Sequence, residues 1–239
     1  SIQQADGVTV ALMDLEEQDR QEYYNGYANR TLWPLFHYRT DLVAYESSFS
    51  EGYARVNSRF AQTLTPLIQD DDFIWVQDYH LLPLAHELRE RGVANRIGFF
   101  LHIPWPARRL MTTLPRHAEL VEALFDYDLI GFQTEDSRDA FTDYIVQSAD
   151  GAVSEDGVVT AFGKTTRIGA FPIGIDAAEF AAAAHSEAAE QAFSRTRASL
   201  LGRKMIVGVD RLDYSKGLEE RFLAYEQFLI DHMPKHEFL

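Results

Sequence analysis

Short apolar runs alternate along the chain with longer segments in which apolar residues recur every three or four positions. Residues 73–76, 97–101 and 129–132 are typical of buried strands, and the segments between them are typical of amphipathic helices. Strand–helix alternation predicts an α/β fold with a parallel sheet covered by helices on both faces. In such sheets, ligands bind at the carboxyl ends of the strands.

The same reading predicts the main elements along the chain. Tyr53, Val56, Phe60 and Leu64 are spaced as one face of a helix, which the acidic run 70–72 ends. Thr134 is a candidate cap for a helix that runs to about residue 147. The other predicted elements are strands at 8–12, 158–162, 165–171 and 205–209, and helices at 81–91, 177–200 and 218–232.

Composition excludes several classes of partner. The chain has 37 acidic and 22 basic residues, and its formal net charge of −15 disfavours nucleic acids and anionic lipid surfaces. Its longest apolar runs are far shorter than the roughly 20 residues of a membrane span. Cysteine is absent, which excludes disulfides and thiolate nucleophiles and fits a reducing compartment such as the cytoplasm.

Two strand ends carry candidate ligand-binding residues. Asp78 follows the strand at 73–76 closely, where a carboxylate accepts hydrogen bonds from a polyol, acts as a base, or simply caps the next helix. His102 ends the strand at 97–101, where a neutral imidazole either binds a hydroxyl or carbonyl group or has a structural role. His86–Glu87 lacks the second histidine of the zinc-protease pattern, so we expect no metal site.

A third strand end carries two cations. Arg211 and Lys216 follow the predicted strand at 205–209, with Gly217 and a helix start behind them. A guanidinium fork, an ammonium group and a helix N-terminus together suit a diphosphate. The alternative is that Arg211 forms a surface ion pair with Asp210 or Asp213. No G-x-G-x-x-G follows a strand, which argues against a dinucleotide-binding dehydrogenase.

Seven segments, in order over nearly the whole chain, resemble one family closely. They are residues 23–25, 32–39, 75–83, 98–106, 128–134, 172–175 and 210–217. The family is that of the trehalose-6-phosphate synthases, retaining glycosyltransferases of the GT-B type with two facing Rossmann-like domains. The resemblance implies transfer of glucose from UDP-glucose to glucose 6-phosphate, which gives α,α-trehalose 6-phosphate and UDP in trehalose biosynthesis.

The resemblance also implies roles for individual residues. It places the acceptor sugar on Tyr24, Trp33 and Asp78, and the donor on His102, Ile103, Arg211 and Lys216. Ile103 would lie beside the anomeric carbon, and Arg211 and Lys216 would stabilise the charge of the leaving phosphate. The family mechanism is drawn without a protein nucleophile, a metal or a cofactor, so no catalytic base is assigned.

Domain organisation follows from the same resemblance. Residues 1–200 are expected to be an acceptor-side Rossmann-like domain without its first strand, and residues 201–239 the start of a nucleotide-sugar-binding domain. We therefore expect a fragment that is inactive by itself. The sequence leaves open the nucleotide (UDP, GDP or ADP) and whether the protein is a homo-oligomer.

Two other functions compete with this interpretation. Another retaining sugar-nucleotide transferase, such as a glycogen or sucrose-phosphate synthase, is disfavoured by the run at residues 33–39. A catalytically silent regulatory subunit of the same fold would be favoured by loss of Asp78, Arg211 or Lys216, and all three are present.

Overall fold

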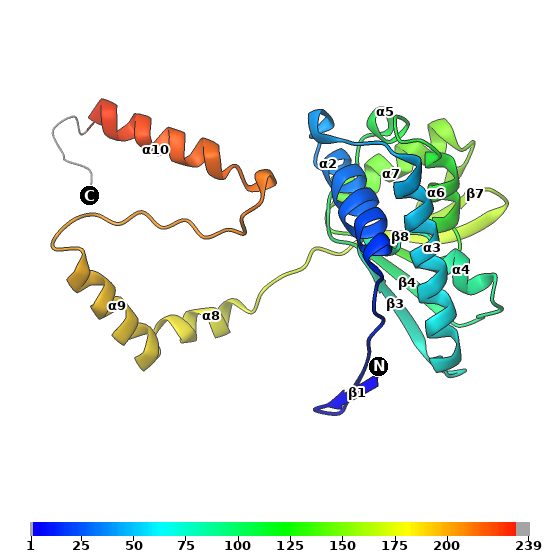
Figure 1. The fold of residues 1–239 in the computed structure, drawn as a ribbon, viewed down its shortest axis with the longest axis horizontal. Helices are drawn as coiled ribbons and strands as arrows, with labels where there is room; N and C mark the ends of the chain where they lie inside the picture. Colours follow the sequence, from blue (N-terminus) through cyan, green and yellow to red (C-terminus); the bar gives the residue numbers. More distant parts are fainter. Residues whose placement is uncertain (1, 233–239) are drawn as a thin grey trace. The chain divides into compact units, whose positions relative to one another are not determined.

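A computed structural model describes residues 2–232, and its internal contacts divide the chain into two units, Ser1–Ile173 and Gly174–Leu239 (Figure 1). The first unit contains a six-stranded sheet in the order β3-β4-β5-β8-β7-β6. Its strands are β3 (Phe73–Gln77), β4 (Arg96–Leu101), β5 (Leu129–Phe132), β6 (Ala152–Val153), β7 (Val158–Ala161) and β8 (Lys164–Ala170). The first four strands of that order pair in parallel, and β7 and β6 pair antiparallel.

The N-terminal residues form a separate hairpin. β1 (Ile2–Ala5) and β2 (Val8–Ala11) pair antiparallel in a two-stranded sheet of their own. The predicted strand at 8–12 therefore forms, but it lies outside the main sheet. The predicted domain division at residue 200 stays a prediction.

The described helical segments of the first unit are α1 (Glu17–Asp19), the π-helical segment η1 (Arg20–Leu32), α2 (Trp33–Phe36), η2 (Thr40–Leu42), α3 (Ser47–Leu64), η3 (Thr65–Leu67), η4 (Tyr79–Leu81), α4 (Leu84–Arg89), α5 (Arg108–Met111), α6 (His117–Leu124) and α7 (Glu135–Ser148). The helices predicted from Tyr53 to Leu64, at 81–91 and from Thr134 to about residue 147 correspond to α3, α4 and α7 of the structure. Tyr53 and Val56 of α3 are buried as their spacing predicts, and Thr134 caps α7 by accepting a hydrogen bond from the Ser137 N–H at 3.2 Å. The helix predicted at 81–91 is shorter, because a 3₁₀ turn precedes Pro83, and Gly92 ends the segment at a φ of +81°.

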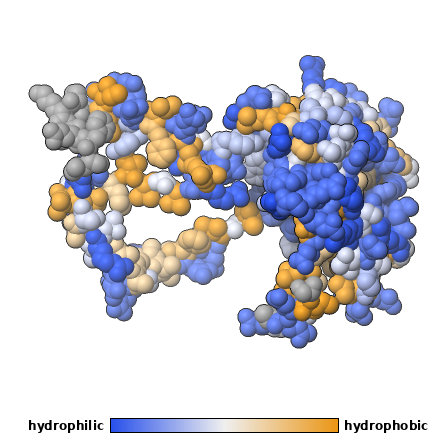
Figure 2. Space-filling model, in the orientation of Figure 1, coloured by the Kyte–Doolittle hydropathy of each residue, from blue (hydrophilic) through white to orange (hydrophobic). Residues whose placement is uncertain are grey.

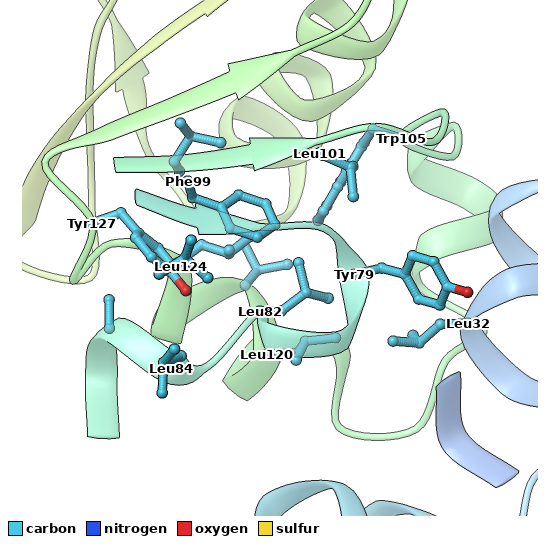
Figure 3. Close-up of a cluster of buried hydrophobic side chains, with 14 of the residues drawn as sticks. Leu32, Tyr79, Leu82, Leu84, Phe99, Leu101, Trp105, Leu120, Leu124 and Tyr127 are labelled. Carbon is cyan, nitrogen blue, oxygen red and sulfur yellow. The ribbon is translucent and has the colours of Figure 1, made fainter. Parts of the chain in front are cut away.

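The hydrophobic core lies on one face of this sheet. Ile97, Phe99 and Leu101 alternate along β4 and belong to the core. Figure 3 shows Phe99 and Leu101 together with buried side chains from the neighbouring helices and loops. Among the residues that the structure describes, all members of this core belong to the first unit.

The opposite face of the sheet is bare. Phe73 and Trp75 are 61% and 66% exposed, and Ile173 is 70% exposed. Between them lies an apolar hollow of about 470 Å³. Within the first unit, the predicted cover of helices on both faces is therefore missing at Phe73 and Trp75. Alternation along the strands tells where apolar side chains point and not which segment covers them.

Residues 174–232 of the second unit contain four helical elements. They are α8 (Ala177–Ala184), α9 (Glu187–Ser199), η5 (Tyr214–Lys216) and α10 (Leu218–His232). The single helix predicted at 177–200 is two helices, because the Ser186 hydroxyl accepts a hydrogen bond from the Ala189 N–H at 3.2 Å and starts a new helix. None of the helices between residues 2 and 232 has the length and apolarity that crossing a membrane needs.

The strand predicted at 205–209 is wrong, since these residues have no regular structure. A strand needs a neighbour to pair its backbone groups, and residues 174–232 contain no strand. The described part of this unit also has no buried residue. Figure 2 shows apolar side chains at its surface.

Candidate active site

Asp78 connects the ends of two neighbouring strands. It directly follows β3, and its backbone N–H donates to the carbonyl of Phe100 in β4 at 2.8 Å. Its carboxylate Oδ1 accepts hydrogen bonds from the backbone N–H of Tyr79 at 3.0 Å and of His102 at 3.3 Å. The structure thus brings Asp78 and His102 together at the carboxyl edge of the sheet, as their positions in the sequence predict.

The backbone of Asp78 is strained. Its φ of 69° and ψ of 168° lie in a region that is essentially restricted to glycine. Such a conformation costs about 1–3 kcal/mol and is typical of ligand-binding and catalytic positions. The capping alternative also holds in part, because the Tyr79 N–H that Asp78 accepts belongs to the first residue of η4.

The two residues after Asp78 contact the two other predicted acceptor residues through their rings. The Tyr24 ring stacks on His80 with centroids 5.6 Å apart and planes 15° apart. Tyr79 contacts His80 at 4.1 Å and Trp33 at 5.6 Å. Tyr24 and Trp33, although distant in the sequence, therefore belong to one aromatic cluster with the two residues that directly follow Asp78.

Tyr79 and His80 are the members of this cluster that sequence analysis missed. The run Asp78–Tyr79–His80 at a strand end was the available signal, but it does not tell which way the rings turn. Burial lowers the pKa of the His80 imidazole, and the Asp78 carboxylate opposes this shift more weakly. A neutral imidazole therefore supports the Tyr24 ring, while the His80 carbonyl accepts a hydrogen bond from Asn57 at 3.2 Å.

His102 and Ile103 are adjacent in sequence but differ in environment. The exposed His102 ring contacts Gln77, with Nε2 2.7 Å from the amide Oε1, and meets Phe100 edge-on at 4.8 Å. Ile103 is 6% exposed and packs in the hydrophobic core. The donor-side roles of both residues stay predictions. Sequence analysis missed Gln77 as a partner of His102.

The two candidate phosphate-binding cations lie in the second unit. Lys216 ends η5, and Gly217 follows it with a φ of 59°. In the described part of the chain neither Arg211 nor Lys216 forms an ion pair. The predicted alternative pair between Arg211 and Asp210 is not formed, because Asp210 binds Arg221 at 2.5 Å instead.

Asp213 lies between these two cations in the sequence, and its side-chain Oδ1 accepts a hydrogen bond from the Ser215 N–H at 2.8 Å. Burial raises the pKa of its carboxyl group. Hydrogen bonds from Ser215 and the charges of Arg211 and Lys216 outweigh that effect, so the pKa lies below its ordinary value. An ionised Asp213 therefore has both cations within electrostatic reach.

Between residues 2 and 232, no group of three or more His, Asp or Glu side chains is arranged to hold a metal ion.

Comparison with known proteins identifies relatives of the chain. Residues 2–238 match glycosyltransferase family 20. A trehalose-6-phosphate synthase of Cronobacter sakazakii is 50% identical over 231 residues, which are 97% of this chain and 48% of that protein. One of Escherichia coli K12 is 49% identical over 229 residues, 96% of this chain and 48% of that protein. The chain thus spans about half the length of these relatives.

Solved structures give the same result. The Burkholderia xenovorans α,α-trehalose-phosphate synthase (UDP-forming) in complex with glucose-6-phosphate has a TM-score of 0.89 at 48% identity. The match covers 98% of this chain and 52% of that one. An E. coli structure bound with UDP-2-fluoro glucose has a TM-score of 0.90 at 48% identity, and the match covers 99% of this chain and 52% of that one. The predicted α/β fold class and the family resemblance are confirmed: the chain belongs to glycosyltransferase family 20.

Proposed function

We propose that the protein containing this chain transfers glucose from UDP-glucose to glucose 6-phosphate, forming α,α-trehalose 6-phosphate and UDP, in the cytoplasm. The observation that carries the proposal is Asp78, strained between two strand ends and followed directly by Tyr79 and His80, whose rings contact Trp33 and Tyr24. The names of the relatives and the ligands of their solved structures support it.

The acceptor site of this proposal uses Asp78, Tyr24 and Trp33. A carboxylate accepts hydrogen bonds from two sugar hydroxyls at once, which fixes the orientation of a pyranose ring. The exposed Tyr24 ring and the half-buried Trp33 ring offer flat apolar faces to the C–H side of the sugar. Together they hold the acceptor at the edge of the sheet where α/β proteins bind ligands.

The donor site uses His102, Ile103, Arg211 and Lys216. The two cations bind the diphosphate through a planar guanidinium and a point charge. During transfer, the bond between the anomeric carbon and the diphosphate oxygen breaks, and the new glycosidic bond forms on the same face. The leaving phosphate oxygen takes the proton of the acceptor hydroxyl, and Arg211 and Lys216 stabilise the charge that develops.

Product analysis tests the proposal. The protein of full family length that contains this chain is incubated with UDP-glucose and glucose 6-phosphate, and the product is identified by NMR. We expect α,α-trehalose 6-phosphate and UDP in equal amounts. Transfer to fructose 6-phosphate or to a glucan, offered as competing acceptors, would contradict the proposal, as would absence of any transfer.

A further inference from the structure

Gln77 is the last residue of β3, and its side chain reaches across to the end of the neighbouring strand. It pairs in register with Phe100, two residues before His102. Its amide Oε1 lies 2.7 Å from the His102 Nε2. Both side chains line the apolar hollow on the bare face of the sheet.

The chemistry of this contact fixes the protonation of the ring. An amide oxygen can only accept a hydrogen bond, so Nε2 of His102 carries the hydrogen. In the neutral ring this leaves Nδ1 as an acceptor for a hydroxyl group.

Gln77 and Asp78 act on the same residue from consecutive positions. Asp78 Oδ1 accepts the backbone N–H of His102 at 3.3 Å, while Gln77 holds the imidazole. The Phe100 ring also packs edge-on against the His102 ring, with centroids 4.8 Å apart. Backbone, ring plane and tautomer of His102 are thus held by three neighbours.

We propose that Gln77 is a positioning residue that fixes the tautomer and orientation of His102, so that Nδ1 accepts a hydrogen bond from a hydroxyl of the donor sugar. This inference rests on the proposed function, in which His102 contacts the donor. Gln77 itself need not touch the sugar.

The first arm of the test needs no activity. The 239-residue chain is labelled with ¹⁵N-histidine, and the His102 Nε2–H signal is assigned by its loss in His102→Asn. We expect the signal in the unsubstituted chain and in Gln77→Glu, which keeps an acceptor oxygen, but not in Gln77→Leu. Gln147→Leu, the same change at an exposed position of α7, should leave it intact. Survival of the signal in Gln77→Leu would overturn the inference.

The second arm measures kinetics in the protein of full family length. Loss of one neutral hydrogen bond predicts that Gln77→Leu raises KM for UDP-glucose about two- to tenfold. The KM for glucose 6-phosphate should stay unchanged, and Gln147→Leu should change neither constant. Equal effects on both substrates, or none, would overturn the donor-directed role.

The two arms separate two kinds of failure. If the unsubstituted protein forms no trehalose 6-phosphate, the proposed function fails, and the donor-directed role of Gln77 fails with it. The NMR arm still decides in that case whether Gln77 fixes the His102 ring.

Discussion

The two units of the chain contrast sharply in burial. The first buries large side chains completely, such as Phe36, Phe141 and Leu101, in one core. In the described part of the second unit no residue is buried, and Val209 and Phe222 are 86% and 69% exposed. Both units have apolar sequences, so the difference lies in the neighbours available to each segment.

The elements that form in the second unit are those that need no distant partner. Asp176 and Ser186 cap α8 and α9 by accepting N–H groups three residues ahead, just as Thr134 caps α7 in the first unit. A helix satisfies its hydrogen bonds within one segment, whereas a strand at 205–209 would need a neighbouring strand. Patterns that depend on local hydrogen bonds, such as helix caps, therefore predict structure in both units. Patterns that depend on a distant partner, such as strands, predict it only in the first.

The largest expected difference is in core stability. Phe141 is fully buried and meets Trp105 at 5.0 Å and Phe132 at 5.3 Å. We expect Phe141→Ala to lower the free energy of unfolding by about 3–5 kcal/mol. The same change at exposed Phe222 should stay within about 0.5 kcal/mol. Urea denaturation followed by circular dichroism measures both, and similar losses would mean that Phe222 is packed.

A second prediction divides the substrates between the units. In the protein of full family length, Arg211→Ala should weaken use of UDP-glucose by about 1.5–3 kcal/mol, roughly ten- to a hundredfold, because a charge-assisted phosphate contact is lost. Asp78→Asn should act mainly on glucose 6-phosphate. Arg195→Ala and Asp71→Asn are matched exposed controls. If Arg211→Ala and Asp78→Asn raised the KM of the same substrate, the division would be refuted.

A third prediction isolates the strain at Asp78. Asp78→Gly and Asp78→Ala both remove the carboxylate, but only glycine adopts a φ of 69° with a ψ of 168° without strain. We expect the glycine variant to unfold at higher urea, by about 1–3 kcal/mol relative to alanine. Both variants should lose use of the acceptor. Equal stability of the two would show that the native backbone here is relaxed.

The smallest expected effect compares two helix caps. Thr134→Ala removes the cap of α7 and should lower the free energy of unfolding of the first unit by about 1 kcal/mol. Ser186→Ala removes the corresponding cap of α9, yet it should reduce only local helicity, because α9 contributes no buried residue. The urea midpoint and the far-ultraviolet signal distinguish these results. If Ser186→Ala shifted the urea midpoint, α9 would unfold cooperatively with the core, which would contradict this prediction.

Some residues of the site could be predicted from the sequence, and others could not. Asp78 and His102 were predictable because the carboxyl ends of parallel strands meet at one edge. The Gln77–His102 hydrogen bond and the Tyr24–His80 stack were not, because both depend on side-chain rotamers across separate segments. The exposure of Trp75 was equally out of reach, since a strand pattern does not name the segment that covers a face.

Hydrogen–deuterium exchange of the 239-residue chain measures directly whether the first unit has a cooperative core and the described part of the second unit has none. Amide exchange reports the free energy of local opening. We expect peptides from β4 and β5 to stay protected for hours, and peptides covering residues 205–209 and α10 to exchange within seconds. Protection of residues 205–209 equal to that of β4 would contradict the account.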